Sequence, residues 1–153
     1  GASFRHNLIA ANAHFALCSA LSGRSCFILQ SDLRVALSNT FVYPDVVVIC
    51  GQPQLIEQDT LLNSTAIVEV LSPSAEAHAR GIKWQRYQQL ESLQDYLLIA
   101  QNAPKVAHLT RQNAHQWLST IYEGLDAVLS LPKLNANLPL SAFYTNVTFG
   151  ESE

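Results

Sequence analysis

Charge is scarce in this sequence of 153 residues, because only 14% of them are Asp, Glu, Lys or Arg, against roughly a quarter in ordinary soluble domains. Nine Lys and Arg against twelve Asp and Glu give a formal net charge of -3, so no global positive field attracts the chain to nucleic acid. Any anionic partner must be bound by a local patch of cations. The uncharged surface that this composition implies favours a homodimer.

Long hydrophobic runs are also missing. The apolar stretch near the start is interrupted by His6, Asn7, Asn12 and His14, and it is shorter than the ~20 residues that cross a bilayer. No basic leader with a small-residue cleavage site is recognisable. We therefore expect a cytoplasmic protein without a membrane partner, folded as one domain over residues 1–153.

Cysteine is rare, and its pattern does not suit a zinc site. Cys18, Cys26 and Cys50 are odd in number, well separated and set among apolar neighbours. They form no CxxC pair and no Cys/His cluster at zinc spacing. We expect three reduced thiols in the core.

The pattern of the apolar residues predicts an α/β (α+β) fold. A helix is expected over 5–21, where apolar residues recur at helical spacing and Ser22-Gly23 follows as a stop signal. A second, more polar helix is expected over 75–91. Strands are expected over 25–30, 33–37, 46–50, 65–71, 96–100, 106–109 and 117–122. Short turns join the last three strands, which predicts a meander.

Two carboxylates stand out in the apolar strands. Asp45 lies just before one buried strand and Glu69 near the end of the next. If these strands pair antiparallel, as consecutive strands often do, both carboxylates fall at the same edge of the sheet. An ionised Glu69 alone in an apolar strand would cost several kcal/mol, so it must be paired, protonated or bound to a cation. Mg²⁺ is one such cation, because it prefers one or two carboxylates plus water and phosphate oxygens.

A purely structural interpretation of the same residues stays open. Asp45 could cap a turn after Pro44, and Glu69 could form an ion pair with Arg80 or Lys83. Lys83 and Tyr87 share a helix face at i, i+4 spacing. That face either is solvated or crosses the strand ends, where Lys83 would reach the carboxylates.

The histidines offer weaker signals. His6 lies on a partly apolar helix, where a structural role is the simpler interpretation. His78, His108 and His115 show no ligand spacing, and we expect them on the surface or in turns.

Pro44-Asp45, followed by Glu69 in a hydrophobic strand, resembles the PD-(D/E)XK nuclease superfamily. The surrounding segments are more specific: Arg5 to Ile9, Ser31 to Val35, Tyr43 to Val46, Thr60 to Asn63, Glu69 to Ser74, Arg80-Gly81, Lys83, Tyr87 and Tyr122 to Gly124. Together they resemble the Uma-type family of putative restriction endonucleases, a bacterial family numerous in cyanobacteria. The resemblance covers essentially the whole chain.

This resemblance implies a restriction-endonuclease-like core, in which a mixed β-sheet is flanked by helices. It also implies a catalytic Mg²⁺ or Mn²⁺ held by Asp45 and Glu69 with the main chain of Val70. Leu71 stands at the superfamily's usual lysine position, two residues beyond the glutamate. The resemblance therefore assigns the lysine's catalytic role to Lys83.

Further roles follow from the same resemblance. His6 and Tyr87 are accessory candidates in the site, and Arg80 and Arg86 are the cations expected to contact nucleic acid. The expected function is a metal-dependent endonuclease that hydrolyses DNA phosphodiester bonds.

The sequence also departs from the family. Ala79 and Ile82 replace commonly acidic and polar residues, and the chain starts after the family's acidic N-terminal hairpin, with no Asp or Glu before Asp32. These departures favour an alternative, a catalytically degenerate module of the same fold that binds nucleic acid or forms dimers. A third reading is a soluble β-rich domain with an incidental ion pair. For the dimer, the residues expected to be exposed are Phe143, Tyr144, Val147 and Phe149.

Overall fold

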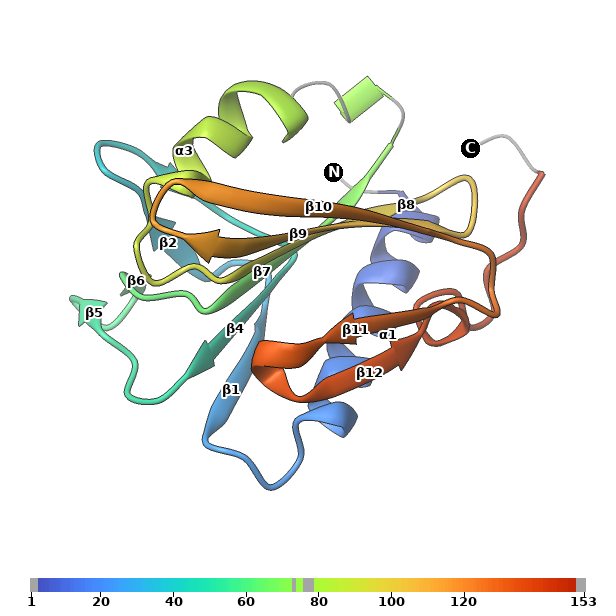
Figure 1. Ribbon diagram of the computed structural model, residues 1–153, viewed down its shortest axis with the longest axis horizontal. Coiled ribbons are helices and arrows are strands. Elements are labelled where there is room, and N and C mark those ends of the chain that lie inside the picture. Colours follow the sequence, from blue (N-terminus) through green and yellow to red (C-terminus); the bar gives the residue numbers. More distant parts are fainter. Residues whose placement is uncertain (1–2, 73, 76–78, 151–153) are drawn as a thin grey trace.

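The computed structural model describes residues 3–72, 74–75 and 79–150. For residues 79 and 80 it describes the backbone but not the side chains. Its centre is a mixed six-stranded sheet in the order β1-β4-β7-β8-β9-β10 (Figure 1). The strands are β1 (Cys26–Gln30), β4 (Val46–Cys50), β7 (Ala66–Leu71), β8 (Asp95–Ala100), β9 (Lys105–Asn113) and β10 (Gln116–Glu123). β7 and β8 are parallel, and the other neighbours are antiparallel. The meander β8-β9-β10 is as predicted.

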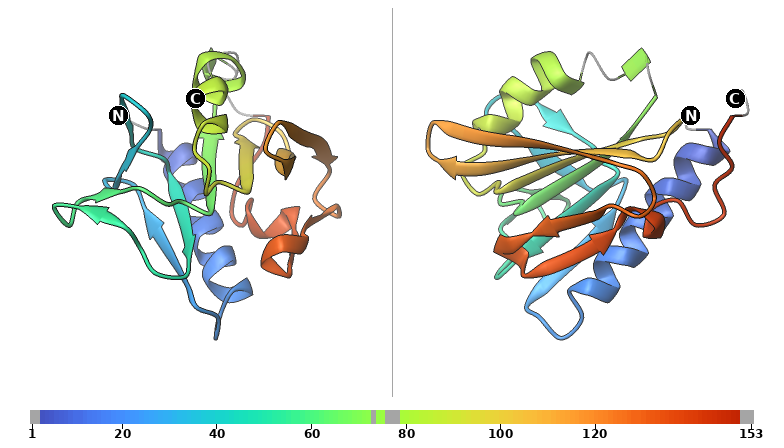
Figure 2. Two further views of the ribbon diagram at one scale, coloured as in Figure 1. Left: turned by 60° about the vertical axis from the view of Figure 1, so that its left-hand side comes forward. Right: turned by 45° about the vertical axis from the view of Figure 1, so that its right-hand side comes forward.

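Helix α1 (Phe4–Ala20) covers one face of this sheet (Figure 2). The Ser3 hydroxyl caps its start by accepting the His6 N–H at 3.1 Å. Ile9, Ala13 and Leu17 recur every four residues, and all three are buried against the sheet. The same face is covered by the hairpin of β11 (Val128–Leu131) and β12 (Ala136–Pro139), with the short helices η2 (Pro132–Leu134) and η3 (Leu140–Ala142).

The opposite face carries helix α3 (Trp84–Gln88) and a small second sheet. That sheet has the order β3-β2-β6-β5, from β2 (Arg34–Ala36), β3 (Phe41–Val42), β5 (Leu55–Ile56) and β6 (Thr60–Leu61). Val35 and Leu61 from the small sheet pack on Val47 and Ile49 of β4. The central strands are therefore covered on both faces, which explains their continuous apolar runs.

Strand β7 shows how an acidic residue enters this core. All six of its residues are buried. Because side chains alternate along a strand, Val68 and Val70 face α1, whereas Ile67 faces α3. Glu69 shares the face of Ile67, so its carboxylate is directed beneath α3.

The connection from β7 to β8 must cross over the sheet, because parallel strands cannot be joined by a tight turn. It contains η1 (Ala79–Lys83) and α3. Gly81 has φ -101° and ψ -109°, which are not helical values and kink the segment just before α3. The helix expected over 75–91 is therefore not continuous: within this span the described residues are helical at 75, in η1 and, as regular α-helix, over Trp84–Gln88, with the irregularity at Gly81.

The structure corrects the prediction of three reduced thiols. Cys26 and Cys50 stand directly opposite each other in the β1–β4 pair, and they form a disulfide. The two cysteines are 24 residues apart in the sequence, so the sequence did not indicate that they are close. Their proximity arises from the strand register. Cys18 is a free thiol.

The expected exposure of the last aromatic residues is also wrong. Phe143 is fully buried and Tyr144 nearly so, because the segment after β12 folds back over α1. Val147 and Phe149 are partly buried against the same core. Phe143 and Tyr144 therefore do not supply a dimer surface. Among the described helices, none has the length and apolarity that crossing a membrane requires.

Candidate active site

The Glu69 carboxylate is the centre of a buried polar cluster beneath α3. Glu69 is 3% exposed, and its Oε1 lies 2.6 Å from the Lys83 Nζ. Lys83 ends η1, so the crossover connection places its ammonium over β7. The side chain of Lys83 is 26% exposed and thus links the carboxylate to solvent. The structure brings Lys83 and Glu69 together.

Two phenols complete the hydrogen bonding of this carboxylate. The Tyr87 hydroxyl donates to Oε1 at 2.7 Å, and the Tyr96 hydroxyl donates to Oε2 at 3.0 Å. Burial, and then the negative charge of Glu69, raise the pKa of Tyr87 far above its usual value, so this phenol stays a donor. The Trp84 ring stacks on Tyr96 with centroids 5.5 Å apart and fixes its position.

Tyr96 was missed in the sequence. It stands in an apolar strand, where an aromatic residue is usually part of the core. Its contact with Glu69 depends on the parallel pairing of β7 with β8, which aligns Tyr96 with Ile67. A tyrosine at the start of a buried strand was the available signal, because a buried phenol needs a hydrogen-bond partner.

Asp45 lies at the end of the β4–β7 pairing. The last paired residues there are Val46 and Val68, and the main-chain N–H of Val70 donates to Asp45 Oδ2 at 2.8 Å. The same oxygen lies 3.2 Å from His6 Nε2, and both side chains are 19% exposed. The N-terminus of α1 and the start of β4 therefore meet at this carboxylate.

The two carboxylates belong to one neighbourhood. β4 and β7 pair antiparallel, as the sequence argument required, and the Asp45 side chain bonds to the residue that follows Glu69. The charges of both Asp45 and Glu69 act on the Tyr87 hydroxyl and help to raise its pKa. The site is thus a small acidic edge into which the Lys83 ammonium is inserted.

The oxygen donors of this cluster decide which metal ions it could hold. The described residues contain no group of three or more His, Cys, Asp or Glu side chains placed to hold a metal ion. Asp45 and Glu69 supply two carboxylates, which fits a cation such as Mg²⁺ that completes its shell with water and substrate phosphate. Glu69 Oε1 already has two donors, Lys83 and Tyr87, whereas Oε2 accepts from Tyr96. Oε2 is therefore the better placed oxygen for such a cation.

The arginines predicted to contact nucleic acid differ in what the structure describes. Arg86 is exposed on α3, on the same element as Tyr87. The side chain of Arg80 lies outside the described part of the chain, as does His78. His115 is exposed in the turn between β9 and β10, as expected.

Comparison with known proteins identifies the family. The profile described as "Uma2: Putative restriction endonuclease" matches residues 1–142. The chain belongs to this family. The matched span includes every residue of the cluster around Glu69.

Two cyanobacterial relatives of this Uma2 family member come from Synechocystis. The protein named "Uncharacterized protein slr1290" is 31% identical over 97% of this chain and 79% of its own length. The protein named "Uncharacterized protein sll1609" is 36% identical over 83% of this chain and 74% of its own length.

A solved structure shares the fold. It is described as a putative nuclease belonging to DUF820 from Anabaena variabilis, and it matches with a TM-score of 0.76 over 96% of this chain and 84% of that chain. At 15% identity the likeness shows the fold alone. It confirms the expected mixed sheet flanked by helices.

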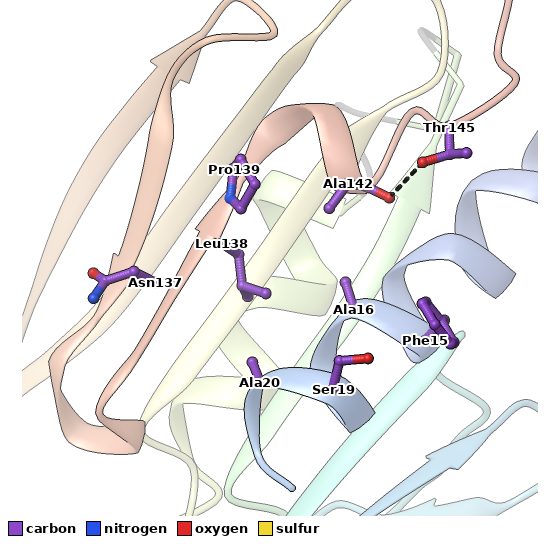
Figure 3. A pocket seen from close by; sticks show the side chains of 9 residues that line it. All are labelled: Phe15, Ala16, Ser19, Ala20, Asn137, Leu138, Pro139, Ala142 and Thr145. Atoms are coloured by element: carbon purple, nitrogen blue, oxygen red, sulfur yellow. Dashed lines mark hydrogen bonds between the residues drawn. The ribbon is translucent and has the colours of Figure 1, made fainter.

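A cavity elsewhere in this Uma2 family member lacks catalytic groups. It has a volume of about 400 Å³ and lies between α1 and the segment from β12 to η3 (Figure 3). It is lined by Phe15, Ala16, Ser19, Ala20, Asn137, Leu138, Pro139, Ala142 and Thr145. None of these side chains is ionisable, so the cavity offers neither a cation nor a general base.

A second buried acid lies on the α1 face of the sheet. Asp95 is fully buried, and its Oδ1 lies 2.7 Å from His108 Nε2. The prediction that His108 lies on the surface or in a turn is wrong, because His108 is 3% exposed in the middle of β9. Alternation along β9 turns His108 inward, to the side that β11 and β12 cover.

Proposed function

We propose that this chain is a metal-dependent endonuclease that hydrolyses DNA phosphodiester bonds. Membership of a family of putative restriction endonucleases supports a nuclease-like function. The observation that carries the proposal further is a group of three side chains. Glu69 is buried, Lys83 is in direct contact with it, and the carboxylate of Asp45 accepts a hydrogen bond from the main chain of the residue after Glu69. Three donors orient the Glu69 carboxylate, and one of them, Lys83, is partly exposed to solvent. Such an arrangement is more typical of a binding site than of a buried structural contact.

Asp45 and Glu69 are the residues that would hold the cation, with the main chain of Val70 beside them. A bound Mg²⁺ or Mn²⁺ would polarise the phosphate and lower the pKa of a water molecule. Glu69 is prepared for this role by Tyr87 and Tyr96, which hold its carboxylate in one orientation. Rigid placement of a ligand by surrounding hydrogen bonds increases its affinity for a metal.

Lys83 is proposed to act on the phosphate itself. Its ammonium is a compact charge on a flexible stem, and a quarter of the side chain reaches solvent. In that position it can leave Glu69 for a phosphate oxygen as negative charge develops there. Arg86, exposed on the adjoining helix, is placed to contact the flanking backbone of the nucleic acid.

The test is the nicking of supercoiled DNA by the purified chain in the presence of Mn²⁺, Mg²⁺ or a chelator. We expect cleavage with either metal and none with the chelator. Mn²⁺ should be the better cofactor, because a site with two carboxylates and the nearby His6 nitrogen suits Mn²⁺ more than Mg²⁺. Asp45→Asn should remove cleavage.

A matched control excludes a contaminating nuclease. Asp126 is exposed in the turn before β11, far along the chain from the site. Asp126→Asn makes the same chemical change there and should leave cleavage unchanged. If Asp45→Asn cleaves as fast as Asp126→Asn, the nuclease proposal is wrong.

A second function is favoured by one observation. Lys83 already neutralises Glu69, and no three-ligand group is found in the described residues. These features suit a non-catalytic module that binds nucleic acid. In that case the chain would retard a DNA fragment in a gel without cutting it, and neither metal nor the Asp45→Asn change would alter the binding.

A further inference from the structure

Strand β10 forms an unusual border of the central sheet. It is the last strand in the sheet order, and among the described residues it pairs only with β9. The left view of Figure 2 shows it at the outer edge, with no other described element beyond it. Natural edge strands are usually guarded by charges, prolines or a short length. β10 has eight residues, and from Gln116 to Tyr122 it contains neither charge nor proline.

The opposite border is protected. β1 is a five-residue strand, and His14 of α1 reaches across to form a hydrogen bond with the Ile28 carbonyl at 3.0 Å. The Cys26–Cys50 disulfide also ties β1 to β4. The two edges of one sheet therefore differ. Beyond the register shift between Gln116 and Trp117, β10 presents a long backbone that is without charge or proline as far as Tyr122.

The hydrogen bonds of β9 show which groups of β10 point outward. The Arg111 N–H donates to the Gln94 carbonyl at 2.9 Å, on the β8 side, so it is turned away from Trp117, its opposite residue in β10. At the other end, the Gly124 N–H donates to the Pro104 carbonyl at 2.8 Å. Hydrogen-bonded and non-bonded pairs alternate in an antiparallel ladder.

It follows that even-numbered residues of β10 bond to β9 and odd-numbered ones point away. The outward groups are the N–H and C=O of Trp117, Ser119 and Ile121. Ser119 is the middle of these three, and its side chain is exposed. Ile121 is 45% exposed. Ser119 and Ile121 are therefore both accessible to a partner strand.

The pattern around Ser119 is self-complementary. An antiparallel copy related by a two-fold axis at Ser119 would set Trp117 opposite Ile121 of the partner subunit. It would set Leu118, which is 52% exposed, opposite Thr120 of the partner subunit. Aromatic residues pair well with β-branched ones across strands, and the absence of charge near the axis means that no side chain meets its own charge.

We propose that β10 is a dimerisation edge, which pairs with β10 of a second copy about a two-fold axis at Ser119. The outward N–H and C=O groups of Trp117, Ser119 and Ile121 would bond to those of the partner. The central sheets of the two copies would then form one continuous sheet. An isologous contact of this kind closes on itself and limits the assembly to two chains.

The experiment measures the mass in solution of the full chain and of charged variants at Ser119, by sedimentation or light scattering at micromolar concentration. The wild-type chain should have twice the 16.8 kDa of one chain. Ser119→Lys and Ser119→Glu should each be monomeric, because two like charges would meet on the axis. An equimolar mixture of the two variants should recover the dimer mass.

Ser119→Ala is the matched control, since it keeps the backbone groups and adds no charge, and it should remain dimeric. Circular dichroism should show that both charged variants are folded, because Ser119 is exposed. Hydrogen exchange gives an independent measure: the Ser119 amide should exchange slowly in the wild-type chain and fast in Ser119→Lys. A monomeric wild-type chain, or a Ser119→Lys variant that stays dimeric, would overturn the proposal.

Discussion

Glu69 and Asp95 are buried carboxylates on two adjacent parallel strands, and the sheet directs them to opposite faces. Glu69, 3% exposed, has both oxygens engaged by donors and touches a lysine that reaches solvent. Asp95, 0% exposed, has one oxygen on His108, while its Oδ2 has no hydrogen-bond partner among the described residues. The acid with the more complete set of partners is thus the one beside solvent.

This difference separates the candidate site from a buried Asp–His pair in the core. Asp95 and His108 are 0% and 3% exposed, so a substrate does not reach them. Glu69 is oriented by groups around it and is connected to solvent through Lys83. Burial of a charge therefore does not by itself indicate function, whereas burial combined with an accessible partner does.

The largest effect is expected for the acidic edge itself. Glu69→Gln keeps the shape of the side chain but removes the charge that would hold the cation, so cleavage should fall by roughly 10³-fold or more. The exposed Glu57→Gln change is the matched control and should leave the rate unchanged. Thermal unfolding should show that both variants are folded. A Glu69→Gln variant with wild-type activity would remove Glu69 from the mechanism.

Asp95→Ala should instead act on stability. It leaves His108 buried without its acceptor, and breaking a buried pair from one side costs about 3 to 5 kcal/mol. Urea unfolding measures this loss. Below the unfolding range, the cleavage rate per folded molecule should stay within about twofold of wild type, because Asp95 faces away from the site. Strong loss of cleavage in a folded Asp95→Ala variant would contradict the division between the two acids.

The sequence predicted one of these acids and missed the role of the other for a physical reason. Asp45 and Glu69 could be paired from local strand patterns and the preference of consecutive strands for antiparallel contact. The burial of His108 depends on segments distant in sequence that cover the α1 face of the sheet. A single histidine in a strand carries no local signal of that cover.

The fold shows the same limit. The long helix α1 and the central strands were predictable, because their apolar patterns extend over many residues. The strands β3, β5 and β6 have two residues each, which is too short for a period to be visible. The Cys26–Cys50 bond follows from the register of β1 on β4, and register is a property of the assembled sheet.

Lys83→Ala tests whether the lysine serves chemistry or only balances the charge of Glu69. If it stabilises charge that develops on the phosphate, cleavage should slow by about 10²-fold while Mn²⁺ affinity is unchanged or higher. Titration calorimetry with Mn²⁺ measures the affinity. Lys133→Ala, an exposed lysine on η2, is the control. A variant that loses Mn²⁺ binding together with cleavage would show a structural role instead.

The smallest effect is expected for Tyr96→Phe, which removes one hydrogen bond to Glu69 Oε2 and keeps the ring that Trp84 stacks on. Mn²⁺ affinity and cleavage should both fall by about tenfold, because a carboxylate that has lost one orienting donor is a less well placed ligand. The parallel loss separates this variant from Lys83→Ala, in which only the rate falls. Tyr122→Phe changes a phenol on β10 that bonds to the Ser130 N–H, and it should alter neither quantity. If Tyr96→Phe and Tyr122→Phe bind Mn²⁺ equally well, the phenol contributes only to packing around Glu69, and the orientation of the carboxylate must come from Lys83 and Tyr87.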